Sequence, residues 1–197
     1  MGNLKNMFLM AGLSEDDATL VFKYFKKKTY QKNEYLLRPG NIATHIYYIE
    51  TGGVILGNMT DKKPITRHRA LASEFITCLE SFHNKSVTDE YLKSSTCSEV
   101  YEINKGDFDS ALKQFPILQN LYQKFVFELL VKCQKRINDL ISQDAYSYLE
   151  QLNITAPAII QNMNQYDLAS YMGIEPQSLS RLRGKRAKKK RIVNNPR

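Results

Sequence analysis

The chain has 197 residues, of which 43% are hydrophobic and 24% are charged, a composition typical of a soluble globular protein with one or two domains. Its 28 Lys and Arg residues outnumber its 20 Asp and Glu residues, which gives a net charge of +8. The N-terminus has no secretory pattern and no apolar stretch is long enough to cross a membrane, so we expect a cytoplasmic protein without a membrane partner. Cys78, Cys97 and Cys133 are too widely spaced to predict a disulfide framework or a zinc site.

The first half of the chain predicts helices followed by a β-rich region. Residues 3–28 have a helical pattern, in which Ser14 and Asp17 resemble a capping box. From residue 30 to about 103, short alternating segments rich in β-formers are separated by turn residues, which is typical of an antiparallel roll or barrel. Residues 81–95 lack a clear period and predict a loop with a short helix. The expected strands are 34–37, 45–49, 54–56, 65–68 and 100–103.

A long helix is predicted after the β-rich region. Residues 107–112 indicate a brief helix, and Pro116 opens a longer one that reaches about Ile141. Two adjoining apolar stripes on the longer helix require it to bury more than one side. We expect it to pack on its own roll and on the same helix of a second copy; an internal helix of one compact domain is the alternative. The expected dimer-interface residues are Leu118, Leu121, Tyr122, Phe125, Leu129, Cys133 and Leu140, and the second stripe contains Val126, Leu130 and Ile137.

Residues 165–182 have the spacing of a helix-turn-helix, after two shorter helical runs that begin at Asp144 and Pro157. Ala169 is small enough for two helices to cross closely, and Gly173 suits a left-handed turn between them. Pro176 suits the first turn of the second helix, where the missing N–H costs nothing. An ordinary helical hairpin would have the same apolar pattern. The residues expected to face inward are Leu168, Met172, Ile174, Leu179 and Leu182.

The charge distribution favours DNA binding over an ordinary hairpin. Residues 181–197 contain nine basic and no acidic residues, which leaves 19 Lys and Arg against 20 Asp and Glu in the rest of the chain. The positive excess therefore follows the second helix directly, where DNA phosphates would lie. We expect Arg181 to contact guanine, since a guanidinium matches its two acceptors. The full set of expected DNA contacts is Gln165, Tyr166, Pro176, Gln177, Ser178, Arg181, Arg183, Lys185 and Arg186.

Three local motifs carry a resemblance to a known family. They are 36–40 (LLRPG), 47–53 (YYIETGG), and 168–174 (LASYMGI) with 180–183 (SRLR). Over nearly its whole length the chain resembles the Crp/Fnr family of bacterial transcription regulators, and its last motif is similar to the branch common in the Bacteroidetes. The resemblance implies an α+β chain: a cyclic-nucleotide-binding-like, antiparallel β-roll of the jelly-roll type with flanking helices. It also implies a long central dimerisation helix and a small C-terminal helix-turn-helix domain. The implied boundaries are 1–114, 115–143 and 144–197.

The departures from this family limit the effector and the cofactor. Cyclic-nucleotide binders of the family hold the phosphate with a Gly-Glu segment and a later Arg. The matching stretch at 72–75 has no Gly, and no Arg occurs between Arg69 and Arg136, so we do not expect cyclic AMP to bind. No Cys precedes Cys78, which excludes the N-terminal cluster of the oxygen-sensing branch, and no metal or other cofactor is expected. Residues 184–197 contain no strand pair, so the domain lacks a clear wing.

Together these patterns predict a homodimeric, sequence-specific regulator that binds a near-palindromic site in double-stranded DNA. An unidentified small-molecule effector in the roll is left open. The alternative is an effector-binding signalling module that acts through protein contacts and binds DNA weakly. An enzyme is not expected, since the chain has no nucleophile–base arrangement, paired-carboxylate motif or phosphate loop.

Overall fold

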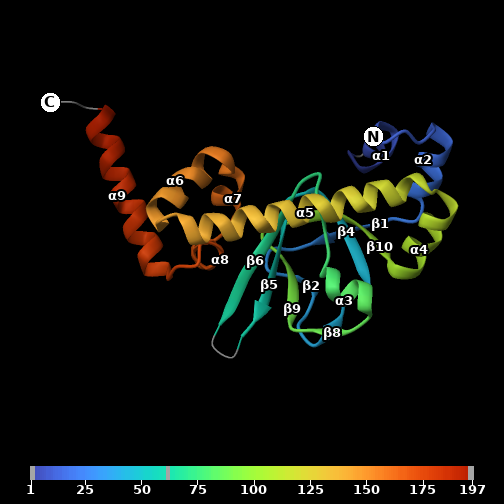
Figure 1. The fold of residues 1–197 in the computed structure, drawn as a ribbon, viewed down its shortest axis with the longest axis horizontal. Helices are drawn as coiled ribbons and strands as arrows, with labels where there is room; N and C mark the ends of the chain where they lie inside the picture. The colour runs from blue at the N-terminus through green and yellow to red at the C-terminus, as the bar shows by residue number, and fades with distance from the viewer. Residues whose placement is uncertain (1–2, 61–62, 195–197) are drawn as a thin grey trace. The chain divides into compact units, whose positions relative to one another are not determined.

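The computed structural model describes residues 3–60 and 63–194, and the chain forms two compact units (Figure 1). One unit ends at Gln134 and the other begins at Lys135, so the boundary lies inside the long helix α5 (Ile117–Ser142). No helix in the described ranges is both long and apolar enough to cross a membrane.

The N-terminal unit contains two four-stranded antiparallel sheets. The first has the strand order β1-β10-β4-β7 and the second β2-β9-β5-β6, while β3 and β8 form a separate pair. These sheets confirm the predicted antiparallel roll. The strands are β1 (Lys26–Tyr30), β2 (Tyr35–Leu37), β3 (Asn41–Ile42), β4 (His45–Thr51), β5 (Gly53–Met59), β6 (Pro64–Leu71), β7 (Phe75–Ile76), β8 (Val87–Thr88), β9 (Glu90–Ser94) and β10 (Ser98–Asn104).

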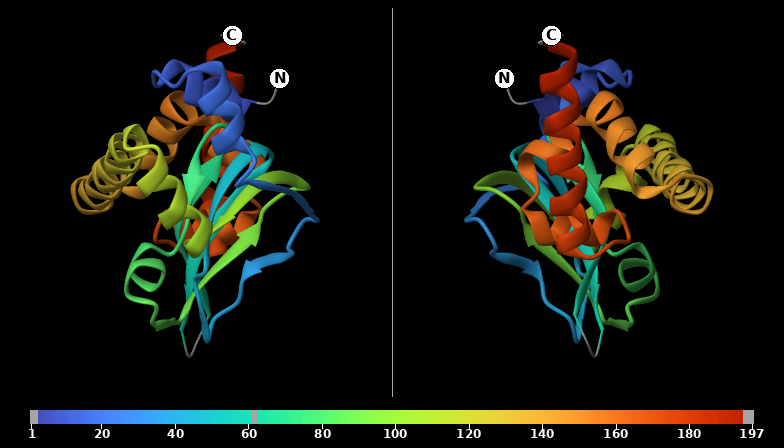
Figure 2. Two further views of the ribbon diagram at one scale, coloured as in Figure 1. Left: turned by 90° about the vertical axis from the view of Figure 1, so that its right-hand side faces the viewer. Right: turned by 90° about the vertical axis from the view of Figure 1, so that its left-hand side faces the viewer.

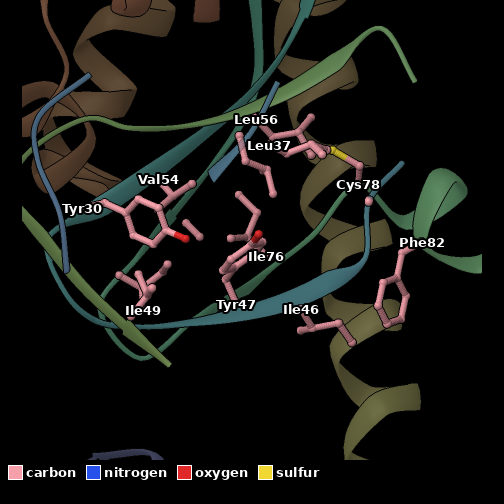
Figure 3. Close-up of a cluster of buried hydrophobic side chains, with 14 of the residues drawn as sticks. Tyr30, Leu37, Ile46, Tyr47, Ile49, Val54, Leu56, Ile76, Cys78 and Phe82 are labelled. Atoms are coloured by element: carbon pink, nitrogen blue, oxygen red, sulfur yellow. The ribbon is translucent and has the colours of Figure 1, made fainter. Parts of the chain in front are cut away.

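Strand β4 is buried on both faces, which explains its nearly continuous apolar sequence. Ile46 and Ile49 belong to the core between the sheets, which Figure 3 shows together with Tyr47 of the same strand and Tyr30 of β1. Tyr48 belongs to a second core, in which helices cover the outer face of the first sheet. The helices of this unit are α1 (Asn3–Met10), α2 (Glu15–Phe22), α3 (Leu79–Asn84), α4 (Lys105–Gln114) and the first part of α5.

Two strands lie where the sequence predicted other structure. The helical pattern predicted through residue 28 ends at Phe22, and β1 begins at Lys26 as an edge strand paired with β10. Tyr30 is buried there, while the lysines face solvent, and the Lys27 ammonium lies 3.0 Å from the Glu99 carboxylate. Lysines on an edge strand discourage pairing with other chains. In the predicted loop at 81–95, β9 pairs with both β2 and β5 and is therefore an inner strand.

The C-terminal unit is helical in its described part. Its helix α6 begins after Asp144, whose carboxylate accepts backbone N–H groups of Tyr146 and Ser147 at 2.8 and 3.1 Å. Hydrogen bonds from Ser147 hold the pKa of the Asp144 carboxyl below its usual value. The remaining helices are α6 (Ala145–Thr155), α7 (Pro157–Asn162), α8 (Gln165–Tyr171) and α9 (Pro176–Asn194).

Helix α9 is much longer than the predicted recognition helix. The predicted helix-turn-helix motif ends at residue 182, but α9 continues unbroken to Asn194 (Figure 2, in red). Lys, Arg and Ala are good helix formers, so the composition supports a helix despite the repulsion of like charges. Residues 145–194 contain no strand, and the predicted lack of a wing holds for this described range.

Candidate nucleic-acid interface

The turn between α8 and α9 has the geometry that its sequence predicts. Leu168 and Ala169 are fully buried, so α8 packs closely through its smallest residue. Gly173 has a φ of +70°, the left-handed conformation expected after the first helix. The N–H groups of Gly173 and Ile174 donate to the carbonyls of Ser170 and Ala169 at 3.1 and 3.0 Å. These hydrogen bonds satisfy backbone carbonyls at the end of α8.

Polar side chains gather on the solvent-facing side of α9. Gln177, Ser180 and Arg181 are exposed, and Leu179 is fully buried on the other side. Residues three and four apart lie on one face of a helix, so the exposed three form one surface. Ser178 is half-buried and, three residues before Arg181, lies at the edge of this surface. Gln177 and Arg181 are therefore exposed, and Ser180, which was not among the predicted contacts, is exposed beside them.

Two basic residues of the predicted DNA contacts have partners inside the unit. Arg186 forms an ion pair with Glu150 of α6, and its spacing from Leu179 places it on the inner side of α9. The Lys185 ammonium lies 5.1 Å from the centre of the Tyr146 ring. Arg183 is half-buried. Arg186 therefore joins α9 to α6, a contact that sequence spacing could not reveal.

The predicted DNA contacts Gln165 and Tyr166, both on α8, differ in the surroundings of their side chains. The Gln165 side-chain amide donates to the Pro176 carbonyl at 3.0 Å and so connects the starts of the two helices. Tyr166 is 74% exposed and presents its ring to solvent. Pro176 itself is half-buried at the first turn of α9. Gln165 thus has a structural contact as well as a position next to the exposed surface.

The last turns of α5 support the helix-turn-helix from within the same unit. The Arg136 guanidinium donates to the Tyr171 carbonyl at 2.8 Å and lies 4.7 Å from the centre of the Tyr171 ring. A Cβ added to Gly173 would lie 3.5 Å from Leu140 Cδ2, which places Leu140 beside the turn. Leu140 was predicted as a member of the interface stripe; in the structure it and Arg136 both contribute to the C-terminal unit.

The apolar stripe predicted as the dimer interface lies largely inside the N-terminal unit. Leu118 is buried, Leu121 packs in the same core, and Tyr122 contacts the Phe108 ring with centroids 5.1 Å apart. The Phe125 ring lies 5.8 Å from Phe75. These residues hold α5 on its own roll, and their part in a dimer interface stays a prediction. The exposed apolar residues of α5 are Phe127, Leu130, Ile137 and Ile141.

The roll lacks the phosphate contacts of a cyclic-nucleotide site in the segment that the sequence singled out. The Glu74 carboxylate accepts the Leu71 N–H at 2.8 Å and pairs with Lys132, so it already has two partners within the unit. Arg69 is buried beside Gly53, where an added Cβ would lie 2.5 Å from a guanidinium nitrogen. Arg69 thus fills the space that Gly53 leaves in the roll.

A polar cavity lies elsewhere in the roll. Its volume is about 210 Å³, and Tyr30, Tyr47 and Glu102 are part of its lining. The Tyr30 hydroxyl donates to Glu102 at 3.0 Å, and burial raises the pKa of Tyr47. Burial also raises the pKa of the Cys78 thiol, which keeps it protonated and a poor metal ligand. The described residues contain no group of three or more His, Cys, Asp or Glu able to hold a metal ion.

Comparison with known protein sequences finds similarity to a bacterial regulator and to a cyclic nucleotide-gated channel. No family model matches the chain. The anaerobic regulatory protein of Bacillus subtilis is 26% identical over 189 residues, which cover 90% of this chain and 79% of that protein. The hyperpolarization-activated cyclic nucleotide-gated channel 2 of Mus musculus is 20% identical over 82% of this chain but only 18% of the channel.

Solved structures share the fold. The c-di-GMP-responsive global regulator CLP of Xanthomonas campestris has a TM-score of 0.70 at 18% identity, covering 89% of this chain and 93% of CLP. FixK2 of Bradyrhizobium japonicum has a TM-score of 0.67 at 13% identity, covering 84% and 85%. The chain has the Crp/Fnr regulator fold. In this fold class the roll precedes the helix-turn-helix, as the resemblance of the sequence implied.

Proposed function

We propose that the chain is a homodimeric, sequence-specific DNA-binding transcription regulator. The observation that carries the proposal is the surface of α9, where Gln177, Ser180 and Arg181 are exposed together while Leu179 behind them is fully buried. A recognition helix reads bases in the major groove through exposed side chains of its first turns. The Arg181 guanidinium suits guanine and the Gln177 amide suits adenine.

The exposed apolar residues of α5 would form the contact with a second copy of the chain. Phe127, Leu130, Ile137 and Ile141 are separated by three, seven and four residues, which fits one coiled-coil seam with Gln134 at the remaining position. Each of the four is more than half exposed in the single chain. Pairing α5 with the same helix of a second copy would remove this surface from water. Two helix-turn-helix motifs would then read two half-sites.

Cyclic AMP is not the effector that we propose for this regulator, and a small-molecule effector in the roll stays open. The stretch at 72–75 provides no guanidinium, and its Glu74 is already engaged by Leu71 and Lys132. The named relatives with this fold include regulators of quite different signals, so the fold does not identify the ligand. We assign no catalytic activity to the chain.

Replacement of Arg181 by Ala tests the DNA-binding surface. A bidentate guanine contact contributes roughly 1–3 kcal/mol of discrimination per half-site, so the variant should lose preference for a duplex selected by the full chain. Its binding to a random duplex should fall much less. Arg38→Ala removes the same charge from an exposed position in the N-terminal unit and should change neither affinity. Equal losses on both duplexes would show that Arg181 contacts only phosphate.

A further inference from the structure

Gly184 is an exposed glycine in the middle of α9. The helix begins at Pro176 and continues past Gly184 to Asn194, so this glycine neither starts nor ends it. Glycine destabilises a helix interior relative to alanine because it loses more backbone freedom on folding. A glycine at such a position therefore needs a reason from its surroundings.

The described part of the unit gives no such reason. A Cβ added at Gly184 would meet no described atom within 4 Å, and its φ is not in the left-handed region. Gly57 in β5 is a useful contrast, since a Cβ there would collide with the Ile65 carbonyl and the Tyr91 ring. The fold requires glycine at 57 but would accept any helix-forming residue at 184.

The position of Gly184 connects it with the proposed DNA surface. It follows Ser180 by four residues and Arg181 by three, so it lies on the same face of α9, one turn further along. The N-terminal residues of a recognition helix contact base edges, and residues nearer its C-terminal end can contact the sugar–phosphate backbone. The missing side chain leaves a gap in the surface at this second turn.

We propose that Gly184 is a clearance residue, which lets a DNA sugar–phosphate backbone lie directly against α9. The inference rests on the proposed DNA binding and adds a steric requirement to it. Glycine is the residue that permits such close approach, because even one methyl group would hold the ligand away from the helix. Gly184 then positions Arg181 and Ser180 at the correct depth in the groove without contacting a base itself.

Gly184→Ala tests the proposal because helix stability and DNA affinity should change in opposite directions. Alanine should raise the melting temperature of the full chain by about 2 °C. It should also weaken binding to a selected duplex and to a random duplex alike, by about tenfold, since overpacking an interface resembles overpacking a core. Gly184→Leu should weaken both further. The dependence of affinity on salt should not change, because no charge is removed.

Two variants provide matched comparisons. Gly106→Ala makes the same change at an exposed position in α4 of the N-terminal unit and should leave both affinities unchanged. Arg181→Ala should affect mainly the selected duplex. An affinity of Gly184→Ala equal to or above that of the natural chain would overturn the clearance role alone, and a loss confined to the selected duplex would overturn its assignment to the backbone. If the natural chain bound neither duplex, the proposed function would fail as well.

Discussion

Gly173 and Gly184 lie close together in the sequence but serve different physical needs. Gly173 has a φ of +70°, which side-chain-bearing residues adopt only with strain. Space is not the limit there, because a Cβ would make an ordinary contact with Leu140 Cδ2 at 3.5 Å. The backbone conformation alone therefore requires glycine at the turn, whereas nothing in the described unit requires it at Gly184.

Gly173→Ala should lower the free energy of unfolding of the C-terminal unit by about 1 kcal/mol, since a residue with a Cβ pays this cost in the left-handed region. Denaturant unfolding, followed by circular dichroism, measures the change. Gly184→Ala is the natural comparison and should raise the stability. A Gly173→Ala variant as stable as the natural chain would mean that the turn between α8 and α9 adopts another conformation.

The spacing of residues along α9 predicted the exposure of some side chains better than that of others. Gln177 and Arg181 are exposed as expected, because local periodicity determines which side of a helix a residue occupies. Arg186 was predicted beside them, but Glu150 lies on α6 and pairs with it. Such a contact joins segments distant in the sequence, so no local pattern could indicate it.

The sheets show the same division between local and distant causes. The strand at 45–49 was predicted from its own apolar residues, and β4 contains it. β1 carries three lysines and looks polar, yet it forms a strand because β10 offers it a complete register of partners. β9 is polar in part and lies between β2 and β5. Pairing partners, rather than the strand's own residues, determine such elements.

Helix α9 can be shortened without removing its contact with α6. Deletion of residues 188–197 removes five basic residues but retains Arg186 and its ion pair with Glu150. Affinity for all DNA should fall, and the log–log dependence of affinity on salt should decrease by about 0.9 for each phosphate that the shortened chain no longer neutralises. Titration of a random duplex at several salt concentrations measures both quantities. An unchanged salt dependence would mean that residues outside 188–197 bind the phosphates.

Helix α5 should hold the dimer through its exposed apolar residues. Ile137→Asp places a charge on the proposed seam and should convert the dimer to a monomer in sedimentation equilibrium. Lys135→Asp introduces the same side chain at an exposed position off the seam and should leave the dimer intact. A dimer that persists in Ile137→Asp would show that another surface joins the two copies.

At the scale of the whole molecule, the two units have different roles in the proposed function. The N-terminal unit would provide the roll and the C-terminal unit the exposed surface of α9, while α5, which runs through both units, would provide the dimer contact. The positive excess lies at the end of the chain that we propose binds DNA, since residues 181–197 contain nine basic residues and no acidic residue. This polarity would steer the C-terminal unit toward DNA before any base is read.

Selection of duplexes from a randomised library by the full chain tests DNA recognition by the dimer most directly. We predict that the enriched duplexes share two inverted half-sites whose centres lie about 34 Å apart, one helical turn, and that two copies of the chain bind each duplex. Enrichment of no common sequence, or of single half-sites bound by one copy, would contradict a dimeric, sequence-specific regulator.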